Sequence, residues 1–146
     1  RQLGIGVIPY LPLAAGLLTG KVGKNGAPPA NTRLAIEQHT AERWITPHNL
    51  KLVSVLDDWA RNHGHSVTEL ALAWLLDEPI VATVIAGASS PAHIRQNVKA
   101  SEWRLTSDER NEVNKILDEM PPENSGDYYS AAGYFNAPTE MTPRVE

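Results

Sequence analysis

A glycine and several small polar residues follow a short apolar run within residues 80–99. The run Ile80 to Ile85 is rich in β-branched residues and does not alternate strictly, which is typical of a parallel strand buried on both faces. Gly87 would let main chain approach a ligand closely. Ser90 and Pro91 are typical of the N-cap and first residue of a helix, whose free amides would point at the carboxyl end of the strand. The pattern predicts a phosphate-binding site.

A cluster of basic residues lies near the beginning of the chain. Arg1, Lys21, Lys24 and Arg33 all precede the first acidic residue, Glu37, although the 146 residues carry a net charge of −4. An acidic protein with a small basic patch favours a small phosphorylated ligand and disfavours nucleic acid. A solvated surface without a ligand remains the alternative explanation for this patch.

Other kinds of chemistry are less well supported. The five histidines show no metal-ligand arrangement beyond His63 and His65, which are two apart in a turn that supplies no carboxylate, and the chain contains no cysteine. The pair Ser89 and Ser90 lacks the glycine pattern of a nucleophile elbow. Residues 60–76 have the outline of a helix-turn-helix, but the second helix has almost no polar residues with which to read bases. We therefore expect no metal, no serine nucleophile and no nucleic-acid partner.

The elements that would position the phosphate site alternate in type. Strands are expected over residues 5–10 and 80–85. Helices are expected over 33–43, from 47 to Gly64, from 67 to 76, from 91 to about 99 and from 107 to about 118, and two of them open with the capping boxes 66–69 and 106–109. The central helix is apolar nearly all round, so we expect it to be deeply buried.

The order of these elements indicates the fold class. A strand, helical crossover and second strand form a parallel (β/α) unit, and two parallel strands cannot stand alone. A (β/α)₈ barrel needs about 250 residues. We therefore predict an α/β fold: the carboxyl-terminal part of a (β/α)₈ TIM barrel over residues 1–118. Residues 119–146 are expected to form an irregular tail or lid, with aromatic residues in 128–135.

The uncharged stretch from Gln2 to Gly20 is long enough to suggest a membrane span. Pro9 and Pro12 would interrupt a helix there, and the glycines add to the cost, so no membrane association is expected. The cytoplasm is the default expectation for location. Because the first residue is Arg1 and not Met, a preceding segment is expected to have been removed or left out.

Two blocks of this sequence resemble a known family. Residues 7–21, VIPYLPLAAGLLTGK, together with 84–89, VIAGAS, and the pair Gln96-Asn97, resemble the carboxyl-terminal part of aldo-keto reductases in order and spacing. The resemblance covers roughly residues 1–118. It implies that the two predicted strands are barrel strands seven and eight, and that NADP(H) lies across their ends. It further implies hydride transfer between NADP(H) and a small-molecule carbonyl or alcohol. The catalytic Tyr, Lys, Asp and His would lie in the upstream half of the barrel, before Arg1.

The same resemblance assigns roles to individual positions. It places Tyr10 against the nicotinamide ring, and Lys21 and Arg33 over the cofactor, with Arg33 near the 2′-phosphate. The remaining positions fall into two groups: Leu11, Pro12, Leu13 and Ala14 along the pyrophosphate, and Gly87, Ser89, His93, Gln96 and Asn97 at the adenine-ribose end.

Some positions depart from the family pattern. The family usually has Ser where this chain has Leu11, and one branch has Lys and Arg where Gly87 and His93 stand here. A preference for NADP over NAD therefore rests mainly on Arg33. A non-catalytic, nucleotide-sensing regulatory subunit of the same fold is the alternative function. The preceding sequence would distinguish the two, because an enzyme should carry the catalytic residues there.

Overall fold

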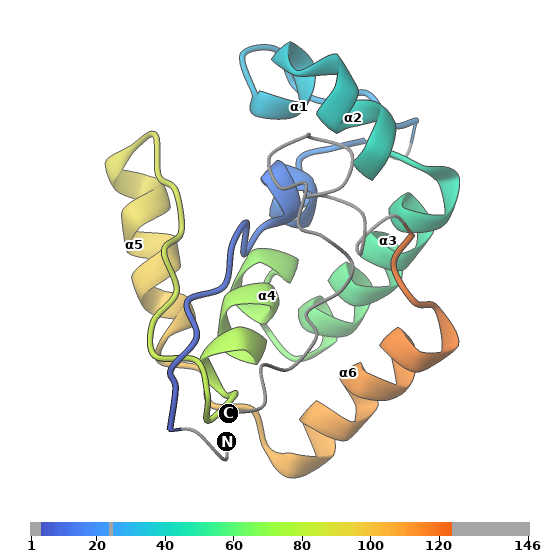
Figure 1. The fold of residues 1–146 in the computed structure, drawn as a ribbon. Helices are drawn as coiled ribbons and strands as arrows, with labels where there is room; N and C mark the ends of the chain where they lie inside the picture. The colour runs from blue at the N-terminus through green and yellow to red at the C-terminus, as the bar shows by residue number, and fades with distance from the viewer. Residues whose placement is uncertain (1–3, 24, 124–146) are drawn as a thin grey trace, which may run out of the picture.

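The computed structural model describes residues 4–23 and 25–123. In Figure 1, α4 lies between α5 on one side and α3 on the other, and α6 packs against α3. The short helices α1 and α2 lie beside the 3₁₀ segment η1. The helical segments are η1 (Ala14–Thr19), α1 (Arg33–Ile36), α2 (Gln38–Trp44), α3 (Pro47–Asn62), α4 (Val67–Leu76), α5 (Pro91–Ala100) and α6 (Ser107–Glu119).

The predicted helix starts are confirmed by their capping bonds. The Thr46 side chain accepts the amide of Asn49 at the start of α3. Both capping boxes are complete: Ser66 pairs reciprocally with Glu69 at the start of α4, and Thr106 pairs with a glutamate at the start of α6. These bonds satisfy amides that have no partner within a helix, so they fix where each helix begins.

The predicted continuous helix over 33–43 is wrong. The backbone leaves helical geometry at Glu37, with φ −95° and ψ 84°, and the segment divides into α1 and α2. The Glu37 carboxylate then accepts the Thr40 hydroxyl at 2.9 Å, which stabilises the first turn of α2. The chain turns at this break. Neither half buries enough apolar residues to stabilise one long helix.

The two predicted strands are extended segments joined by a single parallel bridge. Val7 donates to the Ile80 carbonyl at 2.7 Å and accepts from the Ala82 amide at 2.9 Å. No named strand forms within the described residues. The expectation that these segments are buried on both faces is wrong for this chain, since Ile5 is 66% exposed and Ile85 is 69% exposed. A lone strand pair has no neighbours to cover its faces or its outer edges.

The core lies between α3, α4 and α6. It consists of Leu52, Leu56, Ala60, Val67, Leu70, Leu105 and Val113, with three tryptophan side chains packed around it. The first part of α4 is deeply buried, as predicted, but its last turn, from Trp74 to Leu76, is only half-buried. The expectation of deep burial therefore holds for part of this helix.

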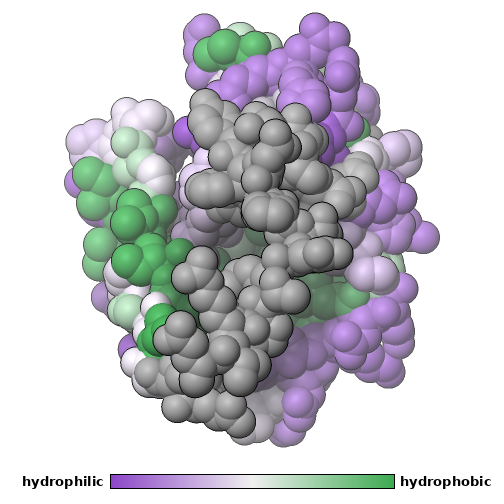
Figure 2. All heavy atoms as spheres, viewed as in Figure 1, coloured by the Kyte–Doolittle hydropathy of each residue, from purple (hydrophilic) through white to green (hydrophobic). Residues whose placement is uncertain are grey.

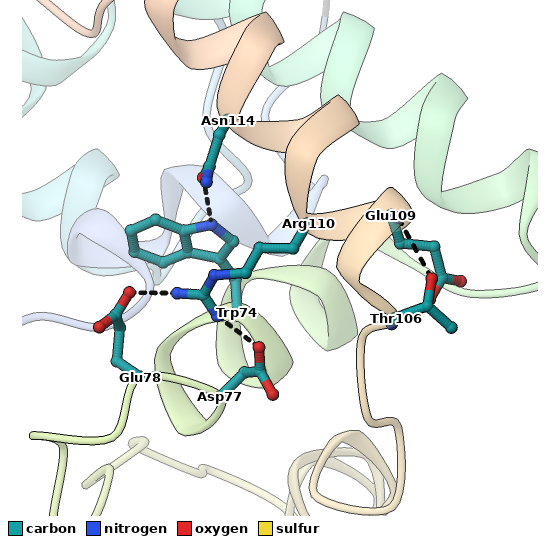
Figure 3. Close-up of polar contacts among 7 residues, drawn as sticks. All are labelled: Trp74, Asp77, Glu78, Thr106, Glu109, Arg110 and Asn114. Carbon is teal, nitrogen blue, oxygen red and sulfur yellow. Dashed lines mark hydrogen bonds and ion pairs between the residues drawn. The ribbon is translucent and has the colours of Figure 1, made fainter.

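Polar contacts attach α6 to α4 (Figure 3). The Arg110 guanidinium contacts the carboxylates of both Asp77 and Glu78, which lie in the turn just before the bridged residue Val81. The indole Nε1 of Trp74 donates to Asn114 Oδ1 at 3.1 Å. We call this set, Trp74, Asp77, Glu78, Arg110 and Asn114, the α6 clamp. It joins α6 to the turn between α4 and residue 80.

The chain after α6 is attached to the start of α3. The buried side chain of Asn49 accepts the Glu123 amide at 2.9 Å and donates to the Glu123 carbonyl at 3.3 Å. The aromatic residues of the predicted tail, Tyr128, Tyr129, Tyr134 and Phe135, lie outside the described residues, and the division into 1–118 and 119–146 stays a prediction. Among the helices that the structure describes, none has the length and apolar character needed to cross a membrane.

Candidate functional site

Three of the predicted site residues meet where the loop after η1 approaches the start of α5. Lys21 Nζ lies 2.9 Å from His93 Nε2, and Ser89 Oγ lies 3.2 Å from Nδ1 of the same ring. Lys21 and His93 are 72 residues apart in the sequence. We call these residues the Lys21–His93–Ser89 group. An ammonium and a hydroxyl placed together can donate hydrogen bonds to a phosphate.

The start of α5 contributes fewer amides than the sequence suggested. The Ser90 side chain accepts the amide of His93 at 3.2 Å, and Pro91 has no N–H. Of the first three helical residues, only Ala92 therefore keeps an amide for a ligand. Recognition of a phosphate here must depend mainly on the side chains of the Lys21–His93–Ser89 group.

The remaining predicted residues of α5 connect it to neighbouring segments. Gln96 Nε2 donates to Ser66 Oγ at 3.4 Å, and Asn97 Nδ2 donates to the Gly87 carbonyl at 3.5 Å. A Cβ added at Gly87 would meet no atom within 4 Å, so there is open space beside this main chain. Ser66, which was not among the predicted site residues, orients Gln96; its only sequence signal was its capping box.

Glu69 contacts Ser66, the partner of Gln96, and is 6% exposed. Its carboxylate accepts the Ser66 amide at 2.8 Å and hydroxyl at 3.0 Å, and lies 3.7 Å from Lys99 Nζ. Burial by itself raises the pKa of Glu69, but the Ser66 hydrogen bonds, with Lys99 and His65, outweigh burial and hold that pKa below its usual range. The carboxylate is therefore charged at neutral pH.

The loop after the first extended segment has an unusual backbone. Leu11, Ala14 and Ala15 have φ values of 52°, 46° and 57°, in the left-handed region that residues with a Cβ rarely adopt. Such a conformation costs about 1–2 kcal/mol per residue. The bonds from the Ala14 amide to the Leu11 carbonyl at 2.8 Å and from the Gly16 amide to Leu13 at 2.9 Å hold the loop. Neither this conformation nor η1 was predicted from the sequence.

The predicted site residues that follow the first extended segment lie apart from the Lys21–His93–Ser89 group. Tyr10, Leu11 and Pro12 line an apolar cavity of about 250 Å³ together with helical residues of α3, α4 and α6. None of the Lys21–His93–Ser89 group lines it. Leu13 and Ala14 form the N-cap and first residue of η1.

Arg33 lies at the start of α1, and its Nε is 3.7 Å from Glu37 Oε1. No contact found within the described residues joins it to Lys21 or His93. A phosphate bound by Arg33 would compete with Glu37. In the same described part of the chain, no group of three or more His, Asp and Glu side chains could hold a metal ion.

The two loops that the structure brings together are the ones whose sequences carry the resemblance, and comparison with known proteins identifies the family. The model of the Aldo/keto reductase family matches residues 1–118. The chain belongs to the aldo/keto reductase family. A (β/α)₈ barrel is the fold of this family, and the helices described here, with one parallel bridge, are consistent with part of such a barrel.

The relatives of this aldo/keto reductase chain are named either as potassium channel subunits beta or as a reductase. It is 40% identical over 99 residues to the probable voltage-gated potassium channel subunit beta of Arabidopsis thaliana. It is 37% identical over 101 residues to L-glyceraldehyde 3-phosphate reductase of Escherichia coli strain K12. These matches cover 66% of the chain but only 30% and 29% of the two relatives. A match of 36% identity over 126 residues to the putative potassium channel subunit beta of Schizosaccharomyces pombe covers 82% of the chain and 36% of that relative.

The family generally uses NADP(H), and the site can be tested for its fit to such a cofactor. Phosphate recognition requires cationic and hydrogen-bond donors near open space. The ammonium of Lys21, the hydroxyl of Ser89 and the uncrowded main chain at Gly87 meet this requirement. The donor set therefore fits a nucleotide phosphate.

Proposed function

We propose that this chain is the NADP(H)-binding carboxyl-terminal portion of a longer aldo/keto reductase that interconverts carbonyls and alcohols by hydride transfer. The observation that carries the proposal is the Lys21–His93 contact of 2.9 Å. It links the loops that follow the two bridged segments, where the cofactor of a barrel of this kind would bind. A small-molecule carbonyl compound is the proposed substrate.

Each predicted residue has a proposed part in this function. Tyr10 packs against the nicotinamide ring, and Leu11 to Ala14 follow the pyrophosphate. Lys21 and Arg33 donate to phosphate oxygens, while Gly87, Ser89, His93, Gln96 and Asn97 hold the adenine-ribose end. When bound, the cofactor supplies the hydride. The residues of this chain bind it, orient it and exclude water from it.

The upstream half of the barrel is the proposed partner. The bridged segments have open outer edges, and Figure 2 shows apolar side chains gathered along α5 and the extended segment beside it. Ile85, Ile94 and Val98 are among the exposed apolar residues. Neighbouring strands and helices of a closed barrel would bury such residues and would supply the catalytic Tyr, Lys, Asp and His.

A nucleotide-sensing regulatory subunit is the second candidate. It is favoured by the relatives named as potassium channel subunits beta, at 40% identity in Arabidopsis thaliana. Both candidates require the same cofactor contacts in this chain. The preceding sequence distinguishes them: an enzyme should contain all four catalytic residues and should transfer hydride to a carbonyl in a single-turnover assay.

The test of cofactor binding uses Arg33→Ala in the complete protein. Charge-assisted hydrogen bonds to phosphate contribute about 1.5–3 kcal/mol, so the variant should bind NADPH about ten- to a hundredfold more weakly. NADH binding should be almost unchanged, because NADH has no 2′-phosphate. Fluorescence titration with each dinucleotide measures both affinities.

The matched control is Arg104→Ala, which removes an exposed arginine from the connection between α5 and α6. It should leave both affinities as they are. Equal weakening of NADPH and NADH by Arg33→Ala would contradict the assignment of Arg33 to the 2′-phosphate.

A further inference from the structure

We propose that His93 makes the preference for a phosphorylated dinucleotide depend on pH, through a proton that its ring takes up when the phosphate binds. The inference rests on the proposed function, since it adds His93 to Arg33 as a second residue through which the cofactor site discriminates NADPH from NADH. It comes from the hydrogen bonds of the Lys21–His93–Ser89 group, which fix where the ring carries its proton.

The contact with Lys21 determines the neutral form of the ring. An ammonium group can only donate hydrogen bonds, so His93 Nε2, 2.9 Å from Lys21 Nζ, must accept. The single ring proton then lies on Nδ1, which donates to Ser89 Oγ at 3.2 Å. Because Ser89 Oγ accepts from the ring, its own hydrogen is available for another acceptor. In this state the group offers an anion the ammonium and the hydroxyl but no charge on the imidazole.

Protonation changes what the group offers. With both ring nitrogens protonated, Nε2 can no longer accept from Lys21, and two cations stand side by side. A phosphate between Lys21 Nζ and His93 Nε2 accepts from both and removes the repulsion. Phosphate binding and ring protonation therefore favour each other, and by linkage the affinity for a phosphorylated ligand rises as the pH falls.

The other charged groups on the elements around His93 are paired with each other or exposed, so they do not account for the proposed pH dependence. On α4, Glu69 is paired with Lys99 of α5 at 3.7 Å. Lys99 is six residues beyond His93, or about 9 Å along the helix axis. On α1, Arg33 is paired with Glu37. Arg95, on α5, is exposed. Within the described residues, no carboxylate contacts the His93 ring, so Lys21 is its charged neighbour.

The test measures the Kd of NADPH and of NADH for the complete protein between pH 6 and pH 8 by fluorescence titration. Histidine changes charge in this range, and a charge-assisted bond replaces a neutral one, so the NADPH preference should rise about tenfold from pH 8 to pH 6. A phosphate monoester also titrates near pH 6. His93→Gln keeps that contribution and removes the ring, so the difference between the two proteins isolates His93.

The matched control is His39→Gln, which removes an exposed histidine of α2 and should retain the wild-type pH dependence. A second measurement uses NMR of the ring nitrogens without any cofactor. The His93 proton should reside on Nδ1 in the wild type and should shift toward Nε2 in Lys21→Met, because the donor that holds Nε2 as an acceptor is gone.

Several results would overturn the inference. These are an unchanged pH dependence in His93→Gln, an equal pH dependence for NADH, or a wild-type ring protonated on Nε2. In each of these cases cofactor binding itself would stand. Failure of both dinucleotides to bind at any pH would instead overturn the proposed function, and this inference with it.

Discussion

At the scale of single residues, Glu69 contacts neighbours on both α4 and α5. It completes the capping box of α4 with Ser66, lies 3.7 Å from Lys99 of α5, and lies 3.8 Å from His65. The pKa of Glu69 is lowered because the Ser66 hydrogen bonds and the neighbouring cations outweigh the effect of burial. Since Ser66 also accepts from Gln96, the charge on Glu69 supports the α4 side of the candidate site.

Glu69→Gln should reduce the free energy of unfolding by about 1–2 kcal/mol at pH 7, because the variant removes a charge-assisted cap. A carboxyl whose pKa is lower in the folded state stabilises the fold above its unfolded pKa. That contribution is lost as the pH falls through the folded pKa. The difference between wild type and variant should therefore shrink toward pH 3, as measured by urea denaturation at several pH values.

Glu109→Gln is the matched control for Glu69→Gln, because Glu109 occupies the same capping-box position in α6. The hydrogen bond from the Thr106 amide lowers the pKa of Glu109 and outweighs burial, which acts in the opposite direction. The capping box of α6 is more exposed to solvent than that of α4. Glu109→Gln should therefore reduce the free energy of unfolding by less than Glu69→Gln. A larger effect at Glu109, or a Glu69 effect independent of pH, would contradict this account.

At the scale of elements, the α6 clamp determines how α6 lies against the rest of the chain. Arg110 contacts two carboxylates and also lies 5.7 Å from the centre of the Trp74 ring. A second indole, that of Trp59 on α3, donates to Glu112 of α6 at 2.8 Å. The clamp acts on Asp77 and Glu78, so it also restrains the turn that leads to Val81 and its bridge with Val7.

Arg110→Ala should lower the free energy of unfolding by about 1–3 kcal/mol, because it leaves two partly buried carboxylates without their partner. Lys115→Ala, in the exposed pair with Glu119 on the same helix, should cost less than about 0.5 kcal/mol. Thermal denaturation of both variants in the complete protein provides the comparison. Equal losses would show that the clamp contributes no more than a surface ion pair.

At the scale of the whole molecule, the described residues form a core and also two extended segments joined only by the Val7–Val81 bridge. The core of α3, α4 and α6 is buried, whereas the extended segments that carry the candidate site are exposed on their outer sides. The matches span 29–36% of the length of the relatives named above. The described helices and the one parallel bridge are consistent with part of the (β/α)₈ barrel of this family.

Residues 1–146 by themselves should not reduce carbonyl compounds. Hydride delivery leaves an alkoxide that needs a positioned acid of suitable pKa, and the proposed acid lies upstream of Arg1. The measurement is NADPH oxidation with a reactive aldehyde, first with residues 1–146 and then with the upstream polypeptide added. A heat-treated sample gives the background. Turnover above that background by residues 1–146 alone would place the acid within this sequence.

The sequence by itself determined the features that depend on neighbouring residues. The starts of α3, α4, α5 and α6 follow from caps whose partners lie within four positions, so local spacing was sufficient to predict them. Two contiguous blocks were likewise sufficient for the resemblance to aldo-keto reductases, which the family match confirms.

Only the tertiary structure decided which distant residues meet. Lys21 and His93 lie 72 positions apart, and the clamp joins Arg110 to residues more than 30 positions earlier. The division of the 33–43 helix and the reduction of two strands to one bridge also depend on what packs against each segment. Hydrogen bonds and ion pairs act over a few ångströms, so their partners are set by the path of the folded chain, which local sequence spacing does not specify.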